Sequence, residues 1–109
     1  MVYLVLEMWY SPGMESKAGK KYLEIMKKYP PDSSVGTIVI PFMVNSTPEG
    51  THTFTVTDVK EGKLEQAIKD ASRNMLEFGG GIEGLKYKIR TYFTALEGMS
   101  LIDLGMPDL

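Results

Sequence analysis

The sequence contains no cysteine and only one histidine, His52. Without cysteine, the chain forms no disulfide bonds and no thiolate metal sites. With one histidine, a single chain cannot supply the two imidazole ligands that many metal sites need. A site built from His52 and carboxylates, or shared across a dimer, stays open, but no spacing in the sequence supports one. We therefore predict no metal and no cofactor.

The sequence also has no excess of positive charge. Twelve Lys and Arg residues stand against fourteen Asp and Glu residues, which gives a formal net charge of −2. Nucleic-acid-binding proteins usually concentrate basic residues on one face, because contacts to phosphates dominate their affinity. Basic residues cluster at 17–28 and at 86–90, but the first cluster lies on the polar face of a predicted helix. Nucleic-acid binding is therefore not expected.

A long hydrophobic segment is missing as well. The apolar N-terminal run is cut short by Glu7, and neither a basic region nor a small-residue cleavage site accompanies it. These features do not fit a signal peptide or a membrane-spanning helix. We expect a cytoplasmic protein without membrane association.

What the sequence does contain is typical of one globular domain. Its 109 residues are 43% hydrophobic and 24% charged, which is ordinary for a folded chain. Disorder would require low hydrophobicity together with high net charge, and the sequence has neither. A chain of this length is enough for one hydrophobic core and no more, so a second domain is not expected.

Hydrophobic periodicity divides the chain into two strand–helix–strand units. Short runs dense in β-branched and aromatic residues predict strands, and apolar residues at three- and four-residue steps predict amphipathic helices. The predicted strands are residues 2–10, 35–44, 51–58 and 85–96, and the predicted helices are residues 14–29 and 62–78. The order of elements is therefore β-α-β-β-α-β.

Proline and glycine mark the boundaries between these elements. Pro30-Pro31 ends the first helix, and Gly79-Gly80-Gly81 is expected to end the second. Pro41 has no amide donor, so its strand is expected at a sheet edge or with a bulge. The six residues 45–50 are turn formers and predict a β-hairpin between the second and third strands.

Residues 79–84 fit the pattern G-x-G-x-x-G, which has the residue types and spacing of the dinucleotide-binding fingerprint. That fingerprint must follow a strand and open a helix, so that the pyrophosphate meets the helix N-terminus. Here the pattern follows a predicted helix and precedes a predicted strand. We interpret it as a helix cap and a loop.

The element order predicts an α+β fold, a ferredoxin-like sandwich. The right-handed crossover rule places both helices on one face of a four-stranded antiparallel sheet. The first and third strands are expected in the centre and the Pro41 strand at an edge. Residues 1–97 form this domain, and the tail 98–109 is too apolar for a solvated end. We expect the tail to pack on its own sheet or on a partner's sheet.

Two helices cover only one face of such a sheet. The side chains on the uncovered face therefore indicate what the protein could bind. The side chains expected to face the helices are Leu4, Leu6, Met8, Phe54, Val56, Ile89 and Phe93. The opposite set forms the open face and comprises Tyr3, Glu7, Trp9, Thr53, Thr55, Arg90 and Tyr92. A face so rich in large side chains is rarely left in water. A second copy of the chain, the tail or a ligand is expected to cover it.

Several short motifs accompany this order of elements. They are the turn Tyr10-Ser11-Pro12-Gly13, the helix end at Pro30-Pro31 and the strand segment 54–58, Phe-Thr-Val-Thr-Asp. Over residues 2–97 the chain resembles the dimeric α/β-barrel superfamily of ferredoxin-like proteins, and within it the small families of uncharacterised domains. The resemblance implies a homodimer. The superfamily includes cofactor-independent monooxygenases, haem-degrading enzymes and muconolactone-type isomerases, but Trp9 and His52 do not match the haem-degrading signature.

Glu7 and Arg90 form the most informative pair, because neighbouring strands should bring both to the open face. A carboxylate buried in a barrel could act as a general base, with Arg90 binding an anionic substrate. The favoured alternative is a cross-strand ion pair that orients the sheet or spans the dimer interface. Beyond these two candidates no catalytic residue is predicted. His52 is interpreted as a surface or capping histidine.

The sequence thus favours a homodimeric α/β-barrel protein that binds a small molecule, an anionic one in particular, in or beside the barrel. The predicted ligand-binding residues are Tyr3, Glu7, Trp9, Thr55, Arg90 and Tyr92. One alternative is a structural or protein-interaction module without a ligand. Another is an enzyme similar to the cofactor-independent monooxygenases or isomerases.

Overall fold

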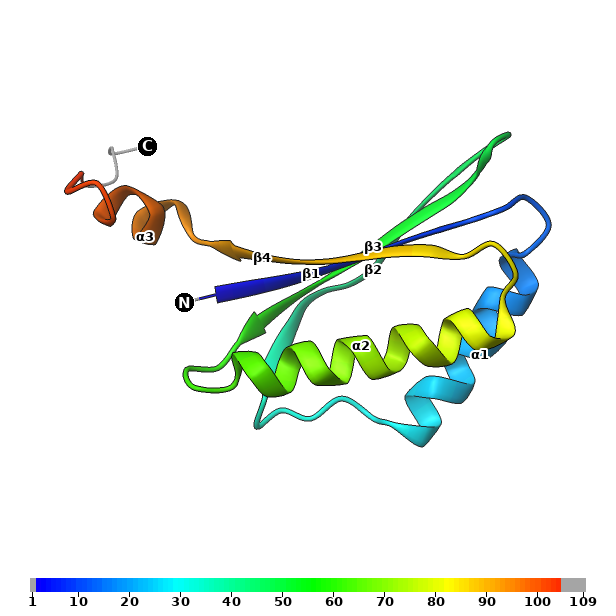
Figure 1. Ribbon diagram of the computed structural model, residues 1–109, viewed down its shortest axis with the longest axis horizontal. Helices are drawn as coiled ribbons and strands as arrows, with labels where there is room; N and C mark the ends of the chain where they lie inside the picture. Colours follow the sequence, from blue (N-terminus) through cyan, green and yellow to red (C-terminus); the bar gives the residue numbers. More distant parts are fainter. Residues whose placement is uncertain (1, 105–109) are drawn as a thin grey trace.

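The computed structural model describes residues 2–104 and contains the predicted β-α-β-β-α-β order followed by a short helix (Figure 1). The elements are β1 (Val2–Tyr10), α1 (Glu15–Lys28), β2 (Gly36–Thr47), β3 (Gly50–Val59), α2 (Leu64–Gly81), β4 (Lys86–Phe93) and α3 (Ala95–Ser100). The four strands pair antiparallel in the order β2-β3-β1-β4. Helices α1 and α2 lie on one side of this sheet (Figure 1). The predicted fold class and strand order are therefore confirmed.

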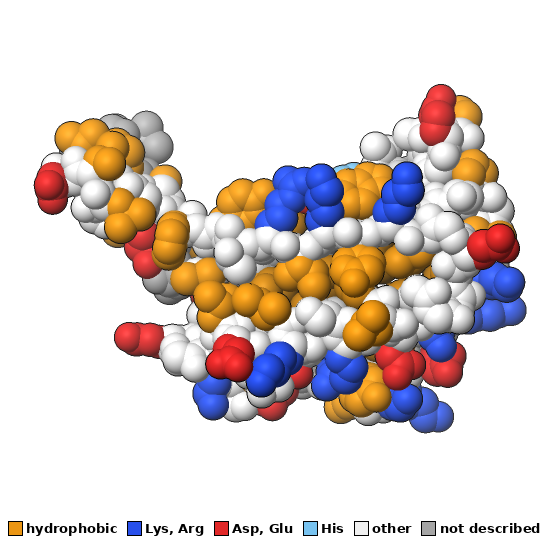
Figure 2. Space-filling view, viewed as in Figure 1, with side chains coloured by type: hydrophobic (Ala, Val, Ile, Leu, Met, Phe, Trp, Pro, Cys, Tyr) orange, Lys and Arg blue, Asp and Glu red, His pale blue; other side chains and the backbone are white. Residues whose placement is uncertain are grey.

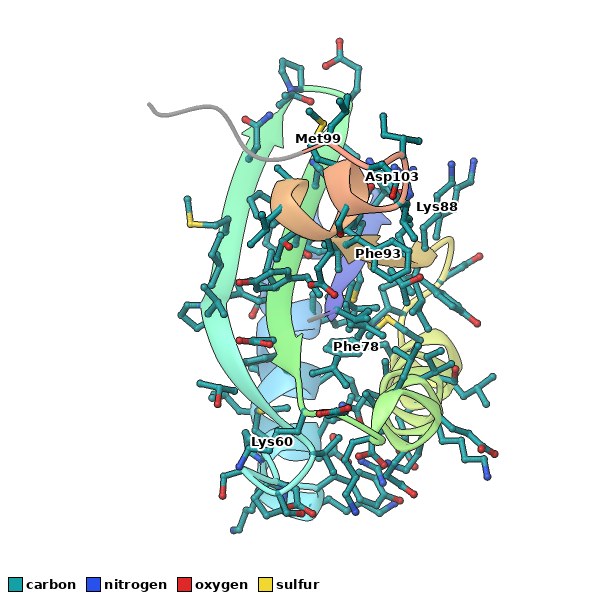
Figure 3. All side chains as sticks on the ribbon, turned by 90° about the vertical axis from the view of Figure 1, so that its left-hand side faces the viewer. Lys60, Phe78, Lys88, Phe93, Met99 and Asp103 are labelled. Atoms are coloured by element: carbon teal, nitrogen blue, oxygen red, sulfur yellow. The ribbon has the colours of Figure 1, made fainter. Side chains whose placement is uncertain are left out.

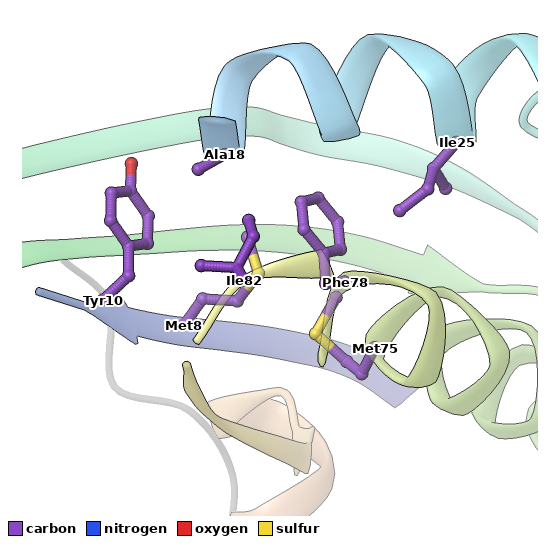
Figure 4. Close-up of a cluster of buried hydrophobic side chains, with 7 residues drawn as sticks. All are labelled: Met8, Tyr10, Ala18, Ile25, Met75, Phe78 and Ile82. Carbon is purple, nitrogen blue, oxygen red and sulfur yellow. The ribbon is translucent and has the colours of Figure 1, made fainter. Parts of the chain in front are cut away.

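The core lies between the sheet and these two helices. In α2 the buried residues recur at the three- and four-residue steps of an amphipathic helix. One cluster joins β1, α1 and α2 and comprises Met8, Tyr10, Ala18, Ile25, Met75, Phe78 and Ile82 (Figure 4). A second cluster lies at the other end of the sheet and comprises Leu4, Val35, Val59, Ala67 and Ala71. The apolar stripes that predicted the helices are thus the surfaces that they bury.

The hairpin between β2 and β3 is tighter than the sequence predicted. Strand β2 continues to Thr47, and only Pro48 and Glu49 separate it from β3. The Thr47 hydroxyl accepts a hydrogen bond from the Glu49 amide at 3.3 Å and donates one to the Gly50 carbonyl at 3.1 Å. These bonds close the turn, so Asn45 and Ser46 remain in the sheet although their residue types favour turns.

The predicted end of α2 is wrong by three residues. The helix continues through Gly79, Gly80 and Gly81, and the Ile82 amide donates to the Phe78 carbonyl at 3.0 Å. The chain turns at Gly84, where φ is +77° and a glycine is favoured. Ile82 is buried against the core cluster, and this packing holds the last turn helical despite the low helix propensity of glycine.

The glycines inside α2 predict an easy gain in stability. A Cβ built at Gly79 would have no atom within 4 Å beyond its own helix and neighbouring residues. We expect Gly79→Ala to raise the free energy of unfolding by about 0.5–1 kcal/mol, because alanine loses less backbone entropy in a helix. Urea denaturation would measure the gain. An unchanged or lower midpoint would show that residue 79 is not helical in solution.

The expected orientation of β3 is wrong. The register pairs Trp9 with His52 and Glu7 with Phe54, and directly paired residues share a sheet face. His52, Phe54 and Val56 therefore lie on the open face, while the threonines face the helices; Thr53 is only 1% exposed. Thr51 and Ser46 bond through their hydroxyls at 3.0 Å. In β3 the face that each side chain occupies is therefore set by the pairing register and by hydrogen bonds, and not by the hydrophobicity of the side chain.

Strand β4 follows the expected alternation, with one exception in burial. Ile89 packs against both core clusters, and Lys88, Arg90 and Tyr92 occupy the opposite face. Phe93 has the predicted orientation, on the face of Ile89, but it remains 59% exposed. Figure 3 shows why, because Phe78 lies between the sheet and α2, whereas Phe93 lies beyond the helices near α3.

The last described segment, α3 and residues 101–104, extends away from the sheet (Figure 1). The Thr94 hydroxyl caps α3 by accepting from the Glu97 amide. The segment has no buried residue and carries the exposed side chains Leu96, Leu101, Ile102 and Leu104. The remainder of the predicted tail, 105–109, lies outside the described residues. Within residues 2–104 no helix combines the length and apolarity that crossing a membrane needs.

Candidate functional site

A polar cluster lies in the middle of the open face, centred on Glu7. Strand β1 is central, so Glu7 has β3 on one side and β4 on the other. Glu7 Oε2 lies 2.9 Å from His52 Nε2, and Glu7 Oε1 lies 3.6 Å from Arg90 Nη1. The Glu7 side chain is 15% exposed, against 34% for His52 and 43% for Arg90. The two partners thus enclose the carboxylate.

Aromatic packing orients the His52 ring. The ring stacks on the Trp9 ring, with centroids 4.9 Å apart and planes inclined by 10°. The centroid of the Phe54 ring lies 6.3 Å from that of His52. When Nε2 carries the proton and donates to Glu7, Nδ1 has a free lone pair. A carboxylate that orients an imidazole in this way makes the ring suited to accept and return a proton.

Arg90 connects the cluster to a basic row on β4. Its Nη1 donates to the Tyr92 hydroxyl at 3.5 Å, and this bond, followed by the charge of Glu7, raises the pKa of Arg90 above its ordinary value. Lys86 and Lys88 occupy the same face and are exposed. Figure 2 shows Lys and Arg side chains aligned above hydrophobic surface along the upper side of the sheet. This face thus carries three cations on β4, against the carboxylates of Glu7 and, at the adjoining hollow, Glu49, a balance that leaves a net positive charge for an anionic ligand.

A hollow of about 270 Å³ adjoins this cluster where β1 ends and β4 begins. Trp9 and His52 line it together with Lys86, so the stacked rings and one of the cations are accessible from it. Its other lining residues are Tyr10, Ser11, Asn45, Thr47, Glu49, Gly50, Thr51 and Gly84. We define the hollow and the cluster of Glu7, His52 and Arg90 together as the open-face site.

The structure brings five of the six predicted ligand-binding residues to the open face, namely Tyr3, Glu7, Trp9, Arg90 and Tyr92. Thr55 lies on the opposite face, where its hydroxyl donates to the Pro41 carbonyl at 3.1 Å. The expected proximity of Glu7 and Arg90 is present, but His52 was missed as a member of the cluster. The antiparallel pairing of Trp9 with His52 is the signal that could have identified it.

Comparisons with known proteins support the fold. No family model and no curated protein matches the sequence. The structure is similar to the de novo designed protein Foldit4, with a TM-score of 0.55 and 9% sequence identity over 85% of this chain and 97% of that one. The fold is ferredoxin-like. A weaker likeness, with a TM-score of 0.44 and 13% identity over 85% of this chain and 93% of the other, is to a protein from Shewanella loihica PV-4 described as a putative monooxygenase. At these identities the likenesses carry no functional argument.

Proposed function

We propose that the chain forms a homodimer through its open sheet faces and binds a small anionic molecule at the open-face site. The observation that carries this proposal is the Glu7 carboxylate held between His52 and Arg90 on an aromatic sheet face. Two sheets packed face to face lie about 10 Å apart. Such a distance would enclose the hollow beside Trp9 and exclude water from the charged groups around it.

The charges and the shape of the site favour a compact anion with a flat apolar part. Arg90 presents a guanidinium suited to a carboxylate or phosphate, and Lys86 lines the hollow itself. The Trp9 ring offers an apolar surface against which a planar ligand can pack. The hollow of about 270 Å³ lies just below the lower end of the usual range for small-molecule sites, about 300 Å³, so it suits only a small metabolite.

Exposed apolar surface supports the dimer. Tyr92 on the open face of β4 and Leu96 of α3 are each about half exposed or more, and large exposed apolar patches mark interaction sites. The resemblance to the dimeric α/β-barrel superfamily points in the same direction. We propose that α3 and residues 101–104 pack on the sheet of the partner copy, because they extend away from their own (Figure 1).

A second candidate function is proton transfer on the bound anion. The specific observation is the 2.9 Å contact between His52 Nε2 and Glu7 Oε2 combined with the stack on Trp9. His52 would remove a proton from the ligand, and Glu7 would stabilise the resulting imidazolium. Incubating the protein with 2-oxo acids in heavy water would test this, since hydrogen exchange at the carbon beside the carbonyl, lost in His52→Gln, is the expected result.

Trp9 provides the test of anion binding because it is the only tryptophan in the sequence and it lines the hollow. We expect carboxylates or phosphate esters from a metabolite panel to change its fluorescence. Arg90→Met should weaken binding by about tenfold or more, since a charge-assisted hydrogen bond contributes about 1.5–3 kcal/mol. Arg73→Met, on α2, removes the same charge away from the open face and is the matched control.

The same titrations decide between the candidate functions. Saturable binding that depends on Arg90 and not on Arg73 would support the ligand-binding proposal. A dimer that binds no member of the panel would instead favour a structural or protein-interaction module. Equal weakening by both substitutions would indicate a nonspecific effect of net charge and would contradict the role given to Arg90.

A further inference from the structure

A second cavity, of about 160 Å³, lies on the opposite side of the sheet, between the sheet and the two helices. Its walls are mostly apolar and include Leu6 and Met8 of β1, Met26 of α1 and Phe78 of α2. The β3 side contributes three hydroxyl-bearing side chains, Thr53, Thr55 and Thr57. Protein interiors are close-packed and rarely leave such a volume empty. A cavity of about 150 Å³ is large enough to hold a molecule the size of benzene.

The irregular course of β2 accounts for the gap. The pairing of β2 with β3 shifts register between Ile38 and Ile40 and again between Ile40 and Met43. Pro41 lies within the second shift and has no backbone N–H to donate to a neighbouring strand. The lining residues that are exposed to solvent lie on the segment after α1 and on β2: Pro30, Pro31, Asp32, Ile38 and Pro41. The cavity therefore opens between these two segments, and a molecule can enter it without unfolding the core.

Arg73 of α2 supplies the polar anchor among these lining residues. Its guanidinium carbon lies 3.8 Å from the centroid of the Tyr29 ring, and this stack fixes the plane of the group. Nη1 donates to Asp70 at 3.4 Å and Nη2 donates to Asn74 at 3.3 Å, both longer than good hydrogen bonds. Nε is buried and has no hydrogen-bond partner among the described residues. Because Arg73 lines the cavity, this N–H is available to donate to the acceptor oxygen of a bound molecule.

The charges around the opening favour a neutral acceptor over an anion. Asp70 lies beside Arg73, and Asp32 is part of the lining. Hydrogen bonds from the Ser34 hydroxyl and then the Ser34 amide hold the pKa of Asp32 below its ordinary value, so it is charged at neutral pH. Asp32 and Asp70 both line the cavity, so a carboxylate ligand would meet two like charges, whereas a carbonyl oxygen can interact with Arg73 without that repulsion.

We infer that this cavity binds a compact, neutral, apolar molecule with a single carbonyl group, such as a cyclic or aryl ketone or aldehyde. The apolar body fills the space between Met8, Met26 and Phe78, and the carbonyl oxygen accepts a hydrogen bond from Arg73. This site is separate from the open-face site and differs from it in ligand charge. Neither site depends on the other.

Ligand-observed NMR titration of the full chain with cyclohexanone and methylcyclohexane tests the inference, because neither probe carries the charge that the open-face site is proposed to bind. We expect cyclohexanone to bind more tightly than methylcyclohexane. Arg73→Met should weaken cyclohexanone binding about tenfold, the lower end for one hydrogen bond from a charged group, and leave methylcyclohexane unchanged. Arg90→Met is the matched control and should leave both unchanged.

A second variant tests the location without altering charge. Ala71 lines the cavity and is buried, so Ala71→Leu should fill the space and abolish cyclohexanone binding. Retention of binding in folded Ala71→Leu, or equal affinity for the ketone and the hydrocarbon, would overturn the inference. If Ala71→Leu does not fold, the test rests on the ratio of cyclohexanone affinity to methylcyclohexane affinity, measured in Arg73→Met and in the unsubstituted chain. An equal ratio in the two proteins would overturn the inference.

Discussion

Phe54→Glu is expected to separate the proposed homodimer into monomers at micromolar concentration. Phe54 lies directly opposite Glu7 on the open face, so the substitution sets two carboxylates side by side where the partner copy is proposed to pack. Packing the partner copy over this site would bury an unpaired carboxylate, which costs several kcal/mol, and a two-fold interface contains the substitution twice. We therefore expect the dissociation constant to rise by about 1,000-fold or more. Sedimentation velocity over a dilution series measures this change.

Leu76→Glu is the control for this experiment. Leu76 is 70% exposed on α2, away from the open face, and the substitution makes a similar change from a large apolar side chain to a carboxylate. We expect it to leave the dimer intact. Monomeric wild-type protein at micromolar concentration would contradict the proposed dimer, and a dimer that persists in Phe54→Glu would place the interface elsewhere on the molecule.

Gly50→Ala is expected to be the most damaging alanine substitution among the glycines of residues 2–104. Residue 50 has φ = +143°, and a Cβ there would lie 2.5 Å from the carbonyl oxygen of Tyr10. The strand β1 and the hairpin would have to separate at the end of the sheet that forms the hollow. Backbone strain of this kind costs about 1–3 kcal/mol, and the clash adds to it. We expect a loss of about 3 kcal/mol or more, measured by urea denaturation.

A comparison with Gly62→Ala separates the two causes. Gly62 also has a positive φ, +78°, but a Cβ there would have no atom within 4 Å. Its substitution should cost about 1–2 kcal/mol, the penalty of the left-handed conformation alone. Equal losses at residues 50 and 62 would show that the contact with Tyr10 does not exist in solution.

The fold was predictable because its signals are local. The apolar stripes of α1 and α2 and the Pro30-Pro31 boundary each specify one element without reference to the rest of the chain. The end of α2 was not predictable, because it depends on Ile82 packing into a core that is assembled from several segments. The prediction of which sheet face the β3 side chains occupy was wrong for a related reason. Alternating threonine and apolar residues fit either face, and the register with β1 decides between them.

The site was predictable only in part. Glu7 and Arg90 could be paired from the strand order alone, since β1 and β4 are neighbours in this topology. His52 lies 45 residues from Glu7 in the sequence, and its place beside Trp9 follows from a hairpin whose turn is shorter than its residue types suggest. A one-residue change in register would move His52 to the other face. The gap beneath β2 likewise has no sequence signal, since it results from side chains that do not meet.

Both margins of the sheet are unsuited to receiving another strand. On one side, β2 carries Pro41 and two shifts in pairing, so its outward hydrogen-bonding groups are not evenly spaced. On the other side, β4 carries Lys86, Lys88 and Arg90, and a row of cations there would oppose the same row on a second copy. Proline, bulges and lysines at edge strands discourage lateral growth into extended β-structure. These two edges therefore discourage copies of this chain from joining their sheets edge to edge.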